Sequence, residues 1–240
     1  GLVGSEMCIR DSLRVIAAQS TSNNEFDLGL GHGKPLSLRL NNVTFGFDKA
    51  NAVIQNISFE VAAGTKVAIV GPSGAGKTTC FEIATGFRLP DSGKASIEGN
   101  DPRLILEHGR GLIGIVPQRP HLVSGTLAEN VSLASSEQTN PDKVRQVLEM
   151  AGLHAYANPG ALEMNVEPDA GQLSGGEIRR LGIARALYRD PGILFLDEAT
   201  SALDAETEAQ ISKVLDSLRG KMTVVLICLL YTSPSPRDRG

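Results

Sequence analysis

A glycine-rich segment between a strand-like stretch and a helix-like stretch is the strongest constraint on how this chain can fold. An apolar run from Lys66 to Val70 leads into Gly-Pro-Ser-Gly-Ala-Gly-Lys-Thr, and a helical stretch then continues to about Thr85. A continuous apolar run of this kind is typical of a strand buried on both faces of a parallel sheet. Strand, loop and helix in this order predict an α/β fold.

The loop from Gly71 to Thr78 has the composition of a phosphate-binding site. Its glycines let the backbone curl so that successive N–H groups face an anion, and the helix that follows adds the positive end of its dipole. Lys77 can reach the β- and γ-phosphates, and the Thr78 hydroxyl can ligate Mg²⁺. We therefore expect ATP and Mg²⁺ to bind at Gly71, Pro72, Ser73, Gly74, Ala75, Gly76, Lys77, Thr78 and Thr79.

A second strand-like segment, Ile193 to Leu196, ends in the acids Asp197 and Glu198. A buried strand that ends in acids places the carboxylates at the carboxyl edge of the sheet, where α/β proteins bind their ligands. Asp197 can hold Mg²⁺ through water. Glu198 can polarise an attacking water as a general base, so we predict that it is the catalytic residue.

Composition narrows the class of protein further. A formal charge of -4 with 4% aromatic residues argues against a nucleic-acid partner, which would favour a basic face and stacking surfaces. No apolar run approaches the roughly 20 residues that span a bilayer. Three cysteines without paired spacing argue against a disulfide framework or a zinc site, and Cys80 is interpreted as a packed core residue.

The rest of the pattern predicts a P-loop NTPase core with a mostly parallel sheet. Leu36 to Leu40 and then Val43 to Phe47 alternate with polar residues, which predicts an N-terminal antiparallel β part, and Asn56 to Val61 predicts a further strand. Helices are expected at 175–187 and 205–218 and a strand at 223–227. A helical subdomain is expected at about 119–185, with one helix capped by Asn140 that buries Val144, Val147, Leu148 and Ala151.

Leu173-Ser174-Gly175-Gly176-Glu177 would by itself indicate only a helix cap. In the order P-loop, Gln118, LSGGE, ILFLDE and Ser201-Ala202-Leu203-Asp204, however, it resembles the nucleotide-binding domain of the ATP-binding cassette (ABC) family. The resemblance covers about residues 36–227. It implies an ATPase that hydrolyses MgATP as the motor domain of a transporter.

The resemblance also implies roles for single residues. Phe47 matches the aromatic residue that stacks on adenine, and Gln118 matches a glutamine that ligates Mg²⁺ and senses the membrane partner. The signature loop and the D-loop would act across a head-to-tail dimer of two cassettes, homo- or heteromeric, in which the loop contacts the γ-phosphate held by the opposite protomer. The residues concerned are Ser174, Gly175 and Gly176 in the loop and Asp204 at the seam.

Two positions depart from the family pattern. Glu177 replaces the usual glutamine, and its negative charge near phosphates is expected to weaken dimer closure slightly. Leu229 stands where the family has a histidine that contacts the γ-phosphate, and none of His32, His108, His121 and His154 fits that role by position. The chain as written is therefore expected to bind ATP yet hydrolyse it poorly.

The segment from Val123 to Val131 resembles the exporter type of cassette, in which a membrane domain usually precedes the cassette in one polypeptide. We accordingly expect residues 13–34 to be a linker from such a domain, residues 35–227 to be the cassette, and the protein to work on the cytoplasmic face of the cell membrane. Two alternatives stay open: a soluble ABC ATPase that is not linked to transport, and a nucleotide-binding regulatory module without turnover. Glu198 argues against the second alternative, because degenerate sites typically lose that acid.

The two ends of the chain have a separate interpretation. Residues 2–12 and 228–238 can be encoded by the two strands of one DNA duplex that resembles a transposase-type sequencing adapter. We therefore interpret residues 1–12 and 228–240 as adapter-derived tails. On this interpretation the expected histidine is lost by truncation.

Overall fold

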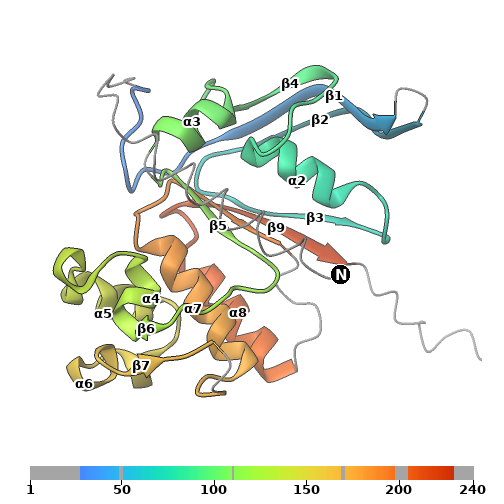
Figure 1. Ribbon diagram of the computed structural model, residues 1–240. Helices are drawn as coiled ribbons and strands as arrows, with labels where there is room; N and C mark the ends of the chain where they lie inside the picture. The colour runs from blue at the N-terminus through green and yellow to red at the C-terminus, as the bar shows by residue number, and fades with distance from the viewer. Residues whose placement is uncertain (1–27, 49–50, 110, 169–170, 198–204, 230–240) are drawn as a thin grey trace, which may run out of the picture.

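The computed structural model describes residues 28–48, 51–109, 111–168, 171–197 and 205–229. In these residues, a parallel sheet has the strand order β3-β9-β8-β5 (Figure 1). Its strands are β3 (Lys66–Gly71), β5 (Ile113–Val116), β8 (Ile193–Leu196) and β9 (Thr223–Leu229). Because all four run in one direction, their carboxyl ends lie at the same edge of the sheet.

A second sheet, with strand order β2-β1-β4, is antiparallel. It contains β1 (Leu38–Asp48), β2 (Asn51–Val61) and β4 (Ser92–Ile97). The buried positions of β1 change from Leu38 and Leu40 to Val43 and Phe45, because the register shifts between Leu40 and Val43, where Asn42 has a φ of 50°. One extra residue at such a bulge reverses the alternation of side chains along the strand. The buried apolar residues of β1 are therefore even-numbered before the bulge and odd-numbered after it.

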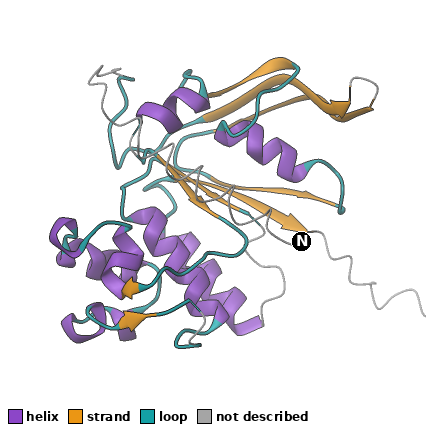
Figure 2. Ribbon diagram, viewed as in Figure 1, coloured by secondary structure: helices purple, strands orange, loops and turns teal. Residues whose placement is uncertain are grey.

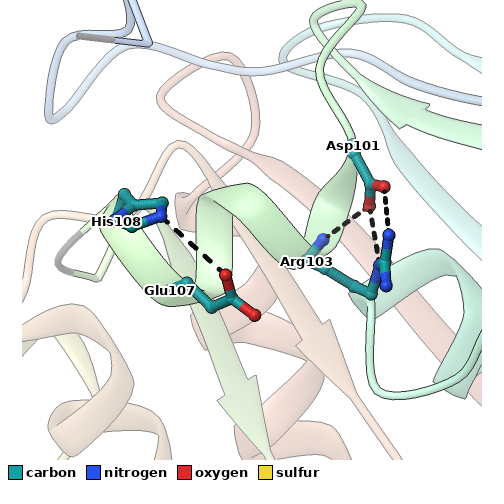
Figure 3. Close-up of polar contacts among 4 residues, drawn as sticks. All are labelled: Asp101, Arg103, Glu107 and His108. Carbon is teal, nitrogen blue, oxygen red and sulfur yellow. Dashed lines mark hydrogen bonds and ion pairs between the residues drawn. The ribbon is translucent and has the colours of Figure 1, made fainter. Parts of the chain in front are cut away.

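One face of the parallel sheet packs against α2 (Lys77–Thr85), α3 (Pro102–His108) and the antiparallel sheet (Figure 1). Phe81 of α2 meets Phe195 of β8 edge to face, with their ring centroids 5.6 Å apart. The N-terminus of α3 is capped by Asp101, whose carboxylate accepts from the Arg103 N–H at 2.9 Å and pairs with its guanidinium at 3.0 Å (Figure 3). Partial burial alone would raise the pKa of Asp101, but the hydrogen bonds from Arg103 hold this pKa below its usual value.

The other face of the parallel sheet carries a mostly helical lobe (Figure 2). Its core joins alternate residues of the sheet, such as Leu194 and Leu196, to the apolar faces of the helices. The elements of this lobe are β6 (Gly125–Thr126), α4 (Leu127–Ser132), η1 (Ser136–Gln138), α5 (Pro141–Met150), η2 (His154–Tyr156), α6 (Pro159–Leu162), β7 (Asn165–Val166), α7 (Gly175–Leu187) and α8 (Ala205–Ser217).

Most of the predicted elements are confirmed. Asn140 caps α5 by accepting from two backbone N–H groups, and the predicted apolar face of that helix is buried. Helix α7 has the predicted bounds, and α8 ends one residue before its expected end. Strand β2 starts five residues earlier than predicted, and β9 continues two residues further than predicted, to Leu229.

The prediction that the Lys66–Val70 strand is buried on both faces is wrong for the described structure. Strand β3 lies at the edge of the parallel sheet, and its residues alternate between exposed and half-buried positions; Val70 is 54% exposed. Strand β8, which lies between β9 and β5, is buried at every position, as predicted. An apolar run thus indicated a parallel strand correctly in both cases but did not show its place in the sheet.

The predicted fold class, a P-loop NTPase core with a mostly parallel sheet, an antiparallel β part and a helical lobe, is confirmed. The boundaries assigned to the linker, the cassette and the helical subdomain remain predictions. Among the described residues, no helix is both long enough and apolar enough to cross a membrane.

Candidate functional site

The predicted phosphate loop and two of the predicted metal ligands lie at one edge of the parallel sheet. The loop follows Gly71, the last residue of β3, while Gln118 and Asp197 follow the neighbouring strands β5 and β8. Those two strands end in register, with Val116 opposite Leu196, and the Asp197 N–H donates to the Val116 carbonyl at 3.0 Å. This is the carboxyl edge at which open α/β sheets bind ligands.

The start of α2 is arranged to receive an anion. Gly76 at the N-cap has φ 80° and ψ 12°, forms no side-chain cap hydrogen bond, and is followed by no acidic residue in the first turn. A Cβ at Gly76 would lie 2.5 Å from Ile54 Cγ2, so the close approach of β2 excludes any larger residue. Such a helix end presents N–H groups and a positive dipole end without a side chain that competes for them.

Lys77 is the one strongly buried cation of this loop, with 8% of its surface exposed. Its Nζ donates to the carbonyls of Gly71 at 2.9 Å and Pro72 at 2.7 Å. Both partners are neutral, and among the described residues no carboxylate forms an ion pair with this ammonium group. An anion placed over the loop would therefore gain a charge-assisted contact by drawing Nζ away from the two carbonyls.

The oxygen-bearing side chains expected to hold Mg²⁺ fit that ion. Thr78 is exposed at the start of α2, Gln118 is exposed after β5, and Asp197 is half-buried after β8. The Asp197 carbonyl accepts from Arg179 Nη2 at 3.3 Å, which ties this strand end to α7. Hydroxyl, amide and carboxylate oxygens are the ligands that Mg²⁺ prefers, with bound phosphates completing the set.

Other predicted residues of the loop divide between surface and core. Pro72, Ser73, Gly74 and Ala75 are exposed, and Thr79 is buried. Cys80 is 6% exposed, which agrees with its interpretation as a packed core residue, and burial raises the pKa of its thiol to about 11.

Phe47 lies near the end of β1, in the β1–β2 hairpin. The same hairpin supplies Val53 and Ile54, which contact Gly76. The Phe47 ring is 66% exposed, and it meets Phe45 edge to face at 5.3 Å. An exposed ring on a hairpin whose second strand packs beside the predicted phosphate loop can stack on a base, which is the role that the resemblance implies for Phe47.

The predicted signature loop belongs to the opposite lobe. Ser174 is the N-cap of α7 and forms a capping box with Glu177, and the preceding Leu173 is part of the core of the helical lobe. The phosphate loop instead leads into α2, whose core lies on the other face of the sheet. Among the described residues, no hydrogen bond joins these two loops.

Three further predicted positions are only partly covered by the structure. Glu198, the predicted catalytic base, and Asp204 lie outside the described residues. Leu229 is the last residue of β9, and its backbone pairs with Gly71 in the parallel register. The position at which the family carries a histidine is thus next to the start of the phosphate loop.

Sequence reasoning missed two side chains at these sites. The Arg88 guanidinium carbon lies 4.9 Å from the centroid of the Phe45 ring and 5.0 Å from that of Phe47, and the same side chain pairs with Glu82 at 2.5 Å. Tyr156 donates a hydrogen bond to Glu177 at 3.0 Å. Neither residue lies within a motif, and only the fold brings each beside its partner.

Comparison with known proteins agrees with this geometry. The family model described as ABC transporter matches residues 54–201. The chain is 42% identical over 194 residues to the ABC multidrug transporter mdr2 of Aspergillus fumigatus, covering 79% of this chain and 24% of that protein. It is 37% identical over 204 residues to a multidrug resistance ABC transporter ATP-binding and permease protein of Lactococcus lactis, covering 83% and 34%.

A similar solved structure is that of a bacterial Atm1-family ABC exporter with ATP bound. It aligns with a TM-score of 0.71 at 32% identity, covering 92% of this chain and 40% of that one. The chain therefore spans about a quarter to a third of the curated relatives named above.

Proposed function

We propose that this chain, which belongs to the ABC transporter family, binds and hydrolyses MgATP as the motor domain of an exporter. Members of this family are ATPases coupled to transport. The observation that carries the proposal is the shared sheet edge: the loop with the uncapped helix start and the buried Lys77 follows β3, and Asp197 follows β8 at the same end of the sheet. An edge of this composition suits a nucleotide triphosphate with its metal ion.

The residues of this edge are proposed to bind different parts of the nucleotide and its metal ion. The N–H groups of the Gly71–Thr78 loop and Lys77 bind the phosphates, and Phe47 stacks on the adenine ring. Thr78, Gln118 and Asp197 hold Mg²⁺, which when bound neutralises charge on the phosphate oxygens. Glu198, next to Asp197 in the sequence, accepts a proton from the attacking water.

The partner is proposed to be a second cassette, identical or different. Ser174, Gly175 and Gly176 would then meet the γ-phosphate held by that cassette, with Asp204 at the seam. Support comes from the separation of the two loops onto opposite faces of the sheet, because a loop in the helical lobe serves a phosphate site more readily on another molecule than on its own. This arrangement makes catalysis depend on closure of the dimer.

A transmembrane domain, in the same full-length polypeptide, is the second proposed partner. The name of the Lactococcus lactis relative combines an ATP-binding and a permease part, and the chain corresponds to 34% of its length. On this proposal the cassette works at the cytoplasmic face of the cell membrane.

Binding is tested first by titrating the chain with a fluorescent ATP analogue in the presence of Mg²⁺, with Lys77→Ala as the negative control. Turnover is tested by phosphate release from the full-length protein and from its Glu198→Gln variant. A rate that falls strongly in the variant supports the proposed motor. Equal rates would favour a regulatory module without turnover.

A further inference from the structure

The N-terminus of α7 carries its own anion. Glu177 Oε2 accepts from the Ser174 N–H at 2.8 Å and from the Ser174 hydroxyl at 2.8 Å, while the Glu177 N–H donates to Ser174 Oγ at 3.3 Å. Both donors of Ser174 are therefore engaged by one carboxylate oxygen of the same chain. A phosphate oxygen that approaches Ser174 has to displace that carboxylate.

Tyr156 of η2 holds the other oxygen of the same carboxylate. Its hydroxyl donates to Glu177 Oε1 at 3.0 Å, so the two oxygens of Glu177 are bonded on opposite sides, one to η2 and one to the cap. The Tyr156 ring is partly buried against the core of the helical lobe, which fixes the position of the hydroxyl. The Glu177 side chain consequently has little freedom to turn away from Ser174.

The charges around this contact keep Glu177 ionised and Tyr156 protonated at neutral pH. Partial burial alone would raise the pKa of Glu177, but the hydrogen bonds from Ser174 and Tyr156 and the positive charge of Arg180 bring this pKa below its usual value. Partial burial and the neighbouring Glu177 raise the pKa of Tyr156, although Arg180 opposes this. The contact is thus a carboxylate that accepts from a neutral phenol.

We propose that Tyr156 is a positioning residue that holds the Glu177 carboxylate over Ser174, so that this carboxylate competes with a nucleotide phosphate for the two donors of Ser174 in the signature loop. The inference rests on the proposed function, in which that loop meets a phosphate held by a second cassette. It adds an intrachain competitor that sets the ATP concentration needed for dimer closure.

The physical reason is that two anions compete for one helix start. A carboxylate at the third helical position accepts from the N–H of the N-cap residue and compensates part of the helix dipole, which weakens the attraction for a second anion. A glutamine amide at the same position would still accept from Ser174 but would carry no charge, and its hydrogen bonds would be weaker than those of a carboxylate.

The proposed role and a purely structural role predict opposite effects of removing these side chains on dimer closure. If Tyr156 and Glu177 only stabilised the start of α7, their removal would loosen the signature loop and weaken dimer closure. If they hold a competitor in place, their removal frees Ser174 and favours closure, even though the helix itself becomes less stable. Association and stability would then change in opposite directions.

The test measures MgATP-driven dimerisation of the 240-residue chain by sedimentation velocity over a range of ATP concentrations. The variants are Glu177→Gln, Tyr156→Phe and the double variant. Glu129→Gln is the matched control, because Glu129 forms the same kind of capping box with Thr126 on α4, where no phosphate contact is proposed. Fluorescent-nucleotide binding to the monomer is measured in parallel.

Glu177→Gln is expected to lower the ATP concentration for half-maximal dimerisation by about 3- to 10-fold, the usual scale for one net hydrogen bond, because the glutamine amide keeps its contact with Ser174 and only the charge is lost. Tyr156→Phe is expected to lower it less, and to have no further effect in the double variant. Glu129→Gln and the nucleotide affinity of the monomer are expected to stay unchanged.

A higher ATP requirement in Glu177→Gln or Tyr156→Phe would overturn the inference, as would an equal shift in Glu129→Gln. Absence of a dimer in every variant would overturn it as well, because removal of the competing carboxylate would then not favour dimerisation. Failure of the unaltered monomer to bind nucleotide would instead contradict the proposed function.

Discussion

Helices α2 and α7 both begin at a glycine-containing loop, but the two helix starts differ in their N-cap residue and in the charge of their first turn. The N-cap of α2 is Gly76, without a side-chain cap or a first-turn acid, whereas α7 has Ser174 at its N-cap and Glu177 in its first turn. One helix start is open to an external anion, and the other is occupied by an anion of its own chain. The sequence shows glycines at both places, so the difference lies in the flanking side chains.

A glycine-rich helix start is therefore not by itself a ready phosphate site. The open start, that of α2, depends on a glycine at the N-cap, Gly76, and on neighbouring residues that leave no room for a larger side chain. The closed start, that of α7, is stabilised by its own cap, and the contact between Ser174 and Glu177 has to break before Ser174 can bind a ligand.

Lys77→Ala removes the cation from the open start and is expected to reduce the affinity for MgATP by about 10- to 100-fold, the scale of one to two strong charged hydrogen bonds. The measurement is a titration with a fluorescent ATP analogue. Lys66→Ala is the control and should bind normally, because Lys66 lies at the start of β3 and pairs with Asp216 of α8. Unchanged affinity in Lys77→Ala would remove the phosphate site from this loop.

Gly76→Ala closes the open start sterically. The residue has a positive φ, and the new Cβ would lie 2.5 Å from Ile54 Cγ2, so we expect about 1–3 kcal/mol of destabilisation and weaker ATP binding. Gly74→Ala is the matched control: its φ is 77°, yet nothing lies within 4 Å of the new Cβ. Urea unfolding should show a smaller loss there, about 1 kcal/mol. Equal losses would mean that the contact with Ile54 does not restrict Gly76.

Ser174→Ala removes the cap of the closed start and is expected to lower the free energy of unfolding by about 1 kcal/mol. ATP binding by the monomer should stay unchanged, because the loop belongs to the other lobe. Asp101→Ala removes the cap of α3 and provides a comparison at a helix outside the proposed site. A lowered ATP affinity of the monomeric Ser174→Ala variant would contradict the separation of the two loops.

The smallest expected effect is a pH dependence of the closed start. The folded-state pKa of Glu177 is lowered, so its contribution to stability is present above the usual glutamate pKa of about 4.3 and is lost as the pH falls through the lower folded-state value. The difference in unfolding free energy between the unaltered chain and Glu177→Gln should therefore shrink on acidification. For a partly exposed group we expect under about 1 kcal/mol. A difference that grows on acidification would show a raised pKa instead.

Much of this architecture could be predicted from the sequence, since its strongest signals are local. The strand, the loop with Lys77 and α2 are contiguous, and α7 has the bounds that its pattern indicated. Place in the sheet could not be predicted: the apolar runs of β3 and β8 look alike, yet β3 lies at the edge of the described sheet. Contacts between residues far apart in the sequence could not be predicted either, because only the fold brings them together. Examples are Arg88 beside Phe47 and Tyr156 beside Glu177.

The most direct test of this account is an amide-resolved NMR titration of the ¹⁵N-labelled chain with MgATP, at a protein concentration that keeps it monomeric. The account predicts saturable shifts for the amides of Gly74, Gly76, Lys77 and Thr78 at the open start. It predicts unchanged signals for Gly175, Gly176 and Glu177 at the closed start. Shifts at the start of α7 without shifts at the start of α2 would contradict it.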